Sequence, residues 1–132
     1  MRMKDTPLWT WHVIAGIVIL VLLSMHMTVM HLNDVLSIAP GTATPEGGAP
    51  IDWANVVSRA QEIGFVVFYV VLLAAGLFHG LYGLRNIIHE LNPSPGVMKT
   101  LTALILIVGL GLFVLGTWAA ITARTVALAP TL

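Results

Sequence analysis

The sequence predicts an all-α membrane protein with three transmembrane helices. Of its 132 residues, 58% are apolar and 9% are charged, whereas a soluble domain has about 25% charged residues. The charged residues are also clustered, leaving uncharged gaps between Asp5 and Asp34, Glu62 and Arg85, and Lys99 and Arg124. Each gap exceeds the roughly 20 residues that a helix needs to cross a bilayer. A backbone in lipid must satisfy its own hydrogen bonds, so each gap predicts a helix.

We place the three spans at about residues 9–32, 63–84 and 100–123, which together form a single membrane-anchor domain over residues 1–132. The first apolar run contains three histidines and exceeds the 7–15 residues of a signal-peptide core, so we expect it to be retained. The absence of cysteine excludes disulfides and thiolate-held metals in this chain.

The connecting segments differ in character. Residues 39–50 are rich in proline and glycine and predict turns. Residues 51–61 alternate apolar and polar side chains at helical spacing, which predicts a short interfacial helix before the second span. Residues 92–96, with the sequence NPSPG, end the second span and turn the chain.

The distribution of basic residues predicts the orientation of the chain. Arg2 and Lys4 precede the first span, and Arg85 and Lys99 flank the loop between the second and third. The loop after the first span carries only Arg59 against three acidic residues. Because short cytoplasmic loops are enriched in Lys and Arg, we expect the N-terminus to be cytoplasmic. Six basic residues cancel six acidic ones, so we expect no nucleic-acid partner.

Histidines inside the spans are the main functional signal. His26 and His79 lie well within apolar segments, where a polar group is costly and usually functional. Gly76, Gly80 and Gly83 form one bare stripe beside His79, which suits a flat ring or a closely packed helix. Imidazole is a common axial ligand of haem iron, so the pattern predicts haem binding. The alternative for both histidines is a hydrogen bond to a neighbouring helix.

The depths of these two histidines predict two haems rather than one. With Trp11 and Arg85 as markers of the inner interface, His26 lies about 22 Å and His79 about 9 Å from it. A difference of about 13 Å is too large for two ligands of one iron, even with tilt. The second ligand of each iron must then come from another membrane subunit. Arg85 is placed either to neutralise a haem propionate or to anchor the helix end.

Residues 77–88, with the sequence LFHGLYGLRNII, resemble the second-helix motif of the smaller hydrophobic anchor subunit of succinate dehydrogenase. The first span, with Ala15-Gly16 and SMHM at residues 24–27, resembles the first helix of bacterial forms of that subunit. The third span matches only in being apolar and rich in glycine.

The resemblance implies a multi-pass subunit of the inner membrane of a bacterium or archaeon that does not itself oxidise succinate. It implies two b haems, ligated by His79 and His26 and shared with a second hydrophobic anchor subunit. Further implied partners are an iron–sulfur subunit, a flavoprotein subunit, membrane lipid, and either menaquinone or ubiquinone.

One departure from the family pattern concerns the quinone. Family members place Asp-Tyr about eleven residues after the ligand His, and that Tyr helps to hold the quinone; here Glu90-Leu91 stand in those places. Tyr82 or a partner residue would then have to supply the donor. Further candidates for a quinone pocket at the cytoplasmic interface are Trp11, His12 and His89.

Two alternative functions remain open. One is the cytochrome b subunit of another membrane oxidoreductase, although such subunits are usually longer than 132 residues. The other is a haem-free structural anchor whose histidines bond to neighbouring helices. A proton or ion carrier is disfavoured, because none of the three spans contains Asp or Glu.

Overall fold

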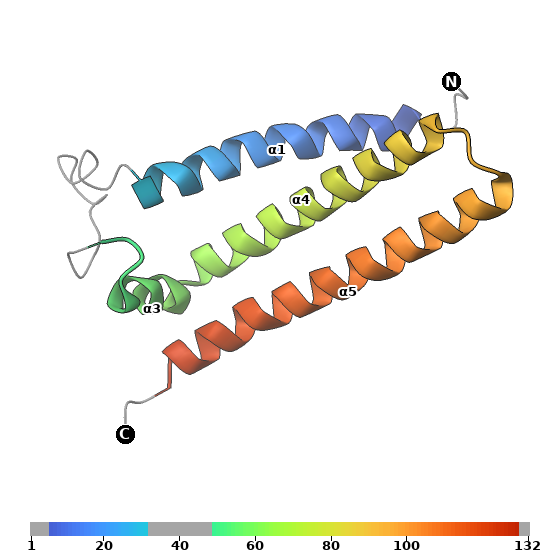
Figure 1. The fold of residues 1–132 in the computed structure, drawn as a ribbon. Coiled ribbons are helices and arrows are strands. Elements are labelled where there is room, and N and C mark those ends of the chain that lie inside the picture. Colours follow the sequence, from blue (N-terminus) through green and yellow to red (C-terminus); the bar gives the residue numbers. More distant parts are fainter. Residues whose placement is uncertain (1–5, 32–48, 130–132) are drawn as a thin grey trace.

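The computed structural model describes residues 6–31 and 49–129, which are helical throughout apart from short connections. Figure 1 shows four helices in these residues, namely α1 (Thr6–His31), α3 (Trp53–Gln61), α4 (Ile63–Glu90) and α5 (Pro95–Ala127). The helices α1, α4 and α5 are each long and apolar enough to cross a membrane. The predicted all-α fold with three spans is therefore confirmed. Most of the predicted turn region, residues 39–48, lies outside the described residues.

The helices extend beyond the apolar segments from which the spans were predicted. The second span was predicted to end at residue 84, but α4 continues to Glu90, and α5 begins at Pro95 rather than at residue 100. A helix can continue into the polar interface after the hydrocarbon region has ended, and the additional turns there can carry polar residues. His89 and Glu90 consequently lie on the last turn of α4 rather than in a loop.

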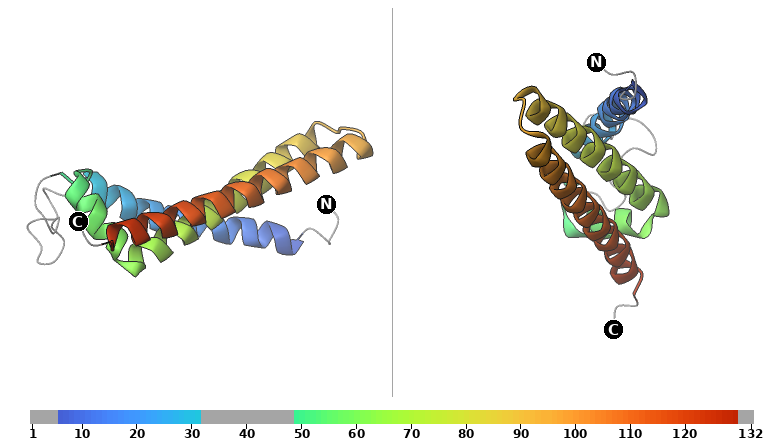
Figure 2. Two further views of the ribbon diagram at one scale, coloured as in Figure 1. Left: turned by 90° about the horizontal axis from the view of Figure 1, so that it is seen from below. Right: turned by 90° about the vertical axis from the view of Figure 1, so that its right-hand side faces the viewer.

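The three long helices form an open row with α4 in the middle. Helix α4 packs against both α1 and α5, whereas α1 and α5 make no contact with each other in the described residues. Two further views show the same arrangement (Figure 2). Ala15 and Val66 are the only apolar side chains buried within the described residues of α1, α4 and α5. The remaining apolar surface on both sides of the row must meet lipid or another membrane subunit.

Glycines allow α4 and α5 to pack closely. A Cβ atom added at Gly109 would lie 2.5 Å from Leu81 Cδ1, and one added at Gly116 would lie 2.5 Å from Leu73 Cδ2. Leucines of α4 therefore fill the space that the missing side chains leave on α5. Small residues at such positions are a general way for transmembrane helices to approach each other.

The predicted short helix before the second span is confirmed as α3, although its inward face is polar. Asn55 is 0% and Arg59 8% exposed, whereas Trp53 is 77% exposed. The Asn55 amide donates to the backbone oxygen of Ala49 at 3.1 Å, and the Arg59 guanidinium donates to that of Pro50. These bonds hold the start of the helix and leave its apolar residues outside, as an interfacial helix requires.

The turn between α4 and α5 forms at the predicted NPSPG segment. Helix α4 ends at Glu90, and Asn92 adopts a left-handed φ of 52°, a conformation that Asn tolerates better than most residues. The Ser94 side chain then caps α5 by accepting a hydrogen bond from the backbone N–H of Val97 at 3.5 Å. The proline after it suits the first turn of a helix, where no N–H is needed.

Candidate functional site

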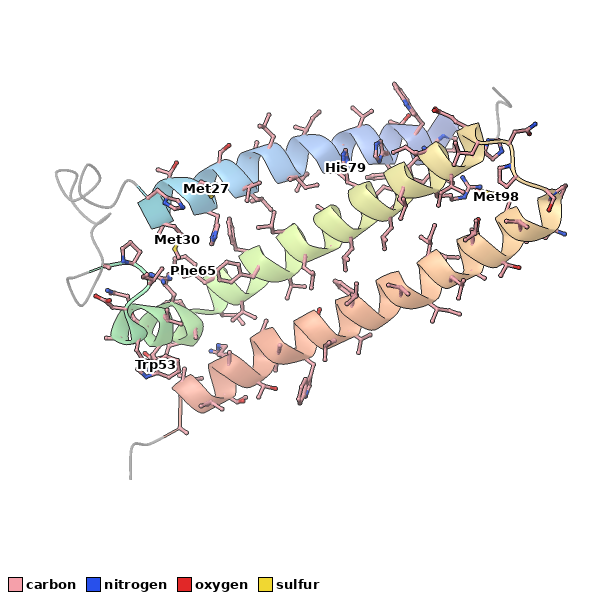
Figure 3. All side chains as sticks on the ribbon, viewed as in Figure 1. Met27, Met30, Trp53, Phe65, His79 and Met98 are labelled. Carbon is pink, nitrogen blue, oxygen red and sulfur yellow. The ribbon has the colours of Figure 1, made fainter. Side chains whose placement is uncertain are left out.

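His79 is held at the contact between α4 and α1. Its Nδ1 atom lies 3.0 Å from the backbone oxygen of His12, and Figure 3 shows the side chain between the two helices. A carbonyl can only accept, so Nδ1 donates and Nε2 becomes the atom with the free lone pair. His79 makes no other hydrogen bond within the part of the chain that the structure describes. The chain thus fixes both the orientation and the tautomer of this ring.

Gly16 provides the space that His79 occupies. A Cβ atom added at Gly16 would lie 3.0 Å from Cε1 and 3.2 Å from Nδ1 of His79. Both distances are shorter than ordinary van der Waals contact between such atoms. The importance of Gly16 is visible only when α1 and α4 are docked, because the sequence does not show which residue of α1 faces His79.

His12 covers one face of the His79 ring. The two ring centroids are 4.0 Å apart and the planes are inclined by only 8°. The Tyr82 ring also contacts that of His12, with centroids 5.2 Å apart and planes inclined by 46°. The Nδ1 atom of His12 is buried and has no hydrogen-bond partner among the described residues. His12, which the sequence offered as a possible member of an interfacial quinone pocket, contacts the rings of His79 and Tyr82.

His26 lies at the opposite end of the same helix contact. Its ring meets that of Tyr69 edge-on, with centroids 5.8 Å apart. It also lines a cavity of about 480 Å³ whose other walls include Met25, Phe65 and Phe68, with Glu62 contributing a carboxylate. Unlike His79, His26 makes no hydrogen bond to a backbone carbonyl within residues 6–31 and 49–129.

The two histidines occupy different levels of the row. His79 is level with Gly16 on α1, and His26 is ten residues further along that helix, or about 15 Å at 1.5 Å per residue. This agrees with the separation of about 13 Å estimated from the sequence. Two nitrogens at this separation cannot bind the same iron.

The predicted glycine stripe on α4 is mostly uncovered. Cβ atoms added at Gly76 or Gly80 would meet nothing within 4 Å, whereas one at Gly83 would lie 3.4 Å from His12 Cε1. The first two glycines therefore leave a flat area of bare backbone beside His79 on one side of the row. Such an area permits close approach by a planar group or by a helix of another chain.

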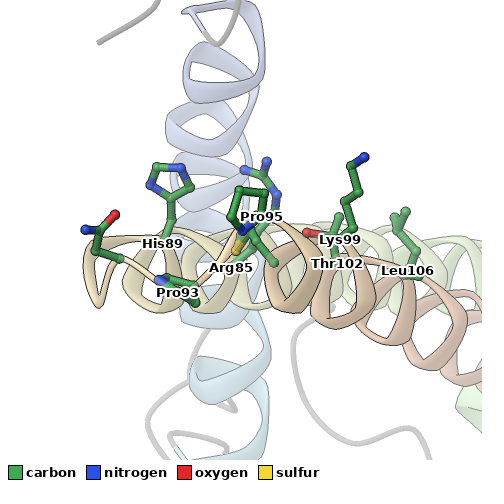
Figure 4. A pocket seen from close by; sticks show the side chains of 10 residues that line it. Arg85, His89, Pro93, Pro95, Lys99, Thr102 and Leu106 are labelled. Carbon is green, nitrogen blue, oxygen red and sulfur yellow. The ribbon is translucent and has the colours of Figure 1, made fainter.

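Arg85 lies on a different side of α4 from His79 and the glycine stripe. Six residues separate His79 and Arg85, which turns the second side chain about 120° from the first around the helix axis. Arg85 lines two cavities between α4 and α5, one of about 700 Å³ and one of about 420 Å³. Figure 4 shows the larger of them, with His89 and Lys99 beside Arg85. The structure thus separates Arg85 from the ring contacts of His79.

The other candidate quinone residues are divided between two adjacent cavities and the exposed surface. Tyr82 lines the smaller cavity between α4 and α5, and His89 lines the larger one. Trp11 is 61% exposed, and Glu90 is exposed on the last turn of α4. Neither Trp11 nor Glu90 lines these two cavities.

The described residues do not supply a complete ligand set at either level: His12 stacks on the face of His79 rather than opposing it, and His26 contacts no second imidazole ring. They contain no group of three or more His, Cys, Asp or Glu side chains close enough to hold a metal ion. An iron bound by His79 would therefore need its opposite ligand from another chain.

The chain matches no protein-family model, no curated protein and no solved structure. Support for a function therefore comes from the positions of the side chains themselves.

Proposed function

We propose that the chain is a haem b-binding membrane anchor subunit of a succinate dehydrogenase or fumarate reductase. In this role it conducts electrons between an iron–sulfur subunit and membrane quinone, while succinate chemistry takes place on a flavoprotein subunit. The N-terminus and the turn between α4 and α5 lie on the cytoplasmic side of a bacterial or archaeal inner membrane. The distribution of basic residues supports this orientation.

The hydrogen bond between His79 and the backbone of His12 carries the proposal. A histidine that binds a metal almost always donates its other ring nitrogen to a carbonyl or carboxylate, which fixes the ring and strengthens the ligand. The 3.0 Å contact from Nδ1 to the His12 oxygen is of this kind. Gly16 permits the contact because any side chain there would displace the ring.

The surface beside His79 fits a large flat group. Gly76 and Gly80 leave bare backbone next to the imidazole, and the exposed apolar side chains of α1 and α4 surround it. A haem at this place would supply one-electron transfer. The chain's own residues would hold it from one flank, with His79 as the axial ligand and the glycines as the contact surface.

His26 is the proposed ligand of a second haem. It lies about 15 Å from the level of His79, beside an apolar cavity of about 480 Å³. Tyr69 and Phe65 flank this cavity and would shield a bound group from water. Two groups at these levels would form a path across most of the hydrocarbon thickness of about 30 Å.

A second hydrophobic anchor subunit completes the proposed sites. Because α1 and α5 pack on α4 without contacting each other in the described residues, neither closes over the remaining surface of α4, and the spans are almost entirely unburied within the chain. A partner packed on the glycine face would supply the opposite axial ligand for each iron. It would also supply quinone contacts, since Trp11 and Glu90 line neither of the cavities that Tyr82 and His89 line.

The deciding experiment is a reduced-minus-oxidised absorption spectrum of the purified complex, with haem quantified per copy of this chain. We expect two b haems in the wild type. His79→Ala and His26→Ala should each remove one haem, and the two variants should lose different spectral components. His31→Ala is the matched control, because His31 is an exposed histidine at the end of α1. Loss of the same haem in both variants, or no haem in the wild type, would refute the proposal.

A haem-free structural anchor is the second candidate function. It is favoured by the stacking of His79 on His12 together with the hydrogen bond to His12, which satisfy the imidazole within the chain. On that reading His79→Ala would loosen the contact between α1 and α4 in a complex with no cytochrome absorption. The spectrum of the wild type alone therefore separates the two functions.

A further inference from the structure

Two neighbouring cavities lie along α4 and α5. The larger, of about 700 Å³, lies at the turn between the helices, and the smaller, of about 420 Å³, lies further along them. Arg85, Thr102 and Leu106 line both cavities, which are therefore adjacent. The larger cavity is lined only by residues of α4, the turn and α5, whereas the smaller one also includes Leu8 of α1 and Tyr82, whose ring contacts that of His12.

The cavity at the turn is basic. Arg85, His89 and Lys99 line it together with Asn92 and Thr102, and no carboxylate is among its lining residues in the described part of the chain. The side chains of Arg85, His89 and Lys99 extend to the same side of α4 and α5 (Figure 4). Although the whole chain has no net charge, this end of the row concentrates positive charge and hydrogen-bond donors. The complementary ligand is a phosphate group.

The smaller cavity is apolar and extends toward the middle of the membrane. Its lining includes Leu77, Phe78, Leu81, Ile105 and Leu110. From Arg85 to Leu77 the cavity follows eight residues of α4, or about 12 Å. This is close to the depth of one leaflet, since the whole hydrocarbon core is about 30 Å thick.

We propose that this site binds an anionic glycerophospholipid. The phosphodiester would lie among Arg85, Lys99 and His89, and an acyl chain would run along the apolar cavity beside Phe78 and Leu81. A basic head region joined to an apolar channel of leaflet depth complements an amphiphile of this kind. A neutral quinone would leave the cationic groups without a counter-charge. The proposal does not rest on haem binding, because Arg85, His89 and Lys99 are not among the hydrogen-bond or ring contacts of His79 and His26.

The test is native mass spectrometry of the full chain, purified after exchange into phosphatidylcholine that contains a small fraction of phosphatidylglycerol. We expect the wild type to retain phosphatidylglycerol selectively. Each basic residue near a membrane surface contributes about a fivefold preference for anionic lipid, so Arg85→Gln with Lys99→Gln should lower retention about 25-fold. Arg124→Gln removes one charge at the far end of α5 and is the control. Arg85→Lys keeps the charge and should keep most of the lipid, which distinguishes lost binding from misfolding.

Competition experiments identify the ligand class. Glycerol phosphate, which has the head but no acyl chain, should not displace phosphatidylglycerol. Displacement by glycerol phosphate would make the site a simple anion site, and displacement by menaquinone at equal concentration would make it a quinone site. Equal retention of phosphatidylcholine and phosphatidylglycerol by the wild type would also overturn the proposal.

Discussion

The imidazole of His79 on α4 stacks on that of His12 on α1 with 4.0 Å between ring centroids, and it also bonds to the His12 backbone oxygen at 3.0 Å. The two interactions involve different parts of His12. The ring supplies contact area, whereas the main chain supplies the hydrogen bond. Substitution of His12 can therefore remove the first interaction while leaving the second in place.

We expect His12→Ala to retain haem at the level of His79. The carbonyl that orients Nδ1 belongs to the main chain, which the substitution preserves. In contrast, His79→Ala removes the proposed axial ligand and should abolish that haem. Haem content per chain, measured as the pyridine haemochrome, distinguishes the two variants. Loss of haem in His12→Ala with retention in His79→Ala would show that His12, and not His79, is the ligand.

We expect Gly16→Leu to weaken haem binding at His79. The new side chain would occupy the space now taken by Cε1 and Nδ1 of the ring and would break the orienting hydrogen bond. Loss of such an outer-shell interaction costs about 10- to 100-fold in metal affinity. Gly111→Leu is the matched control, because a Cβ atom at Gly111 meets nothing within 4 Å. Equal haem affinity in both variants would show that the ring does not depend on Gly16.

We expect Gly116→Leu to destabilise the contact between α4 and α5. A Cβ atom at this position would lie 2.5 Å from Leu73 Cδ2, and overpacking of this kind costs about 1–3 kcal/mol. Gly116→Ala should cost much less, because the end of the Leu73 side chain can turn away. The thermal unfolding midpoint in detergent is the measurement. A midpoint for Gly116→Leu equal to that of Gly111→Leu would show that the two helices are not closely packed here.

We expect Asn55→Leu to loosen α3. Its fully buried amide donates to the Ala49 oxygen at 3.1 Å, and leaving such an acceptor unsatisfied costs about 1–3 kcal/mol. Backbone hydrogen exchange over residues 53–61 should become faster. Ala54→Leu, on the exposed side of the same helix, should leave exchange unchanged, and equal protection in both variants would contradict the prediction.

We expect α3 and the turn after α4 to lie on opposite sides of the membrane. The absence of cysteine allows single reporter thiols at two exposed positions, introduced as Ala54→Cys and Glu90→Cys. In intact cells, a membrane-impermeant maleimide should label the first and not the second, with labelling of both after permeabilisation. The reverse pattern would invert the orientation predicted from the basic residues.

The helices were predictable because hydrocarbon imposes a simple rule on the chain. A stretch without charge that is long enough to cross the bilayer must be helical, and α1, α4 and α5 follow it. The predicted positions of the helix ends were less accurate. The last turn of α4, including His89, lies outside the apolar segment from which the span was predicted. The inward polar face of α3 was also not foreseen, since its partners are the backbone oxygens of Ala49 and Pro50.

The depths of the two candidate ligand histidines could be predicted from the sequence, whereas their side-chain contacts could not. Counting residues along each helix placed His26 and His79 at different depths, and the structure gives a similar separation. The rotation of α1 against α4 is set by side-chain packing, so the pairing of His79 with His12 and Gly16 could not be read from spacing. The position of Arg85 was accessible from helical geometry, because a six-residue interval does not return to the same face.

The shortage of buried side chains in the row of α1, α4 and α5 has a consequence for how the protein is made. With only Ala15 and Val66 enclosed among the described apolar residues of these three helices, a newly inserted copy gains little stability from its own packing. We therefore expect surplus copies synthesised without companion subunits to be removed by membrane proteases. Cellular abundance of this polypeptide would then follow the supply of its companions rather than its own rate of translation.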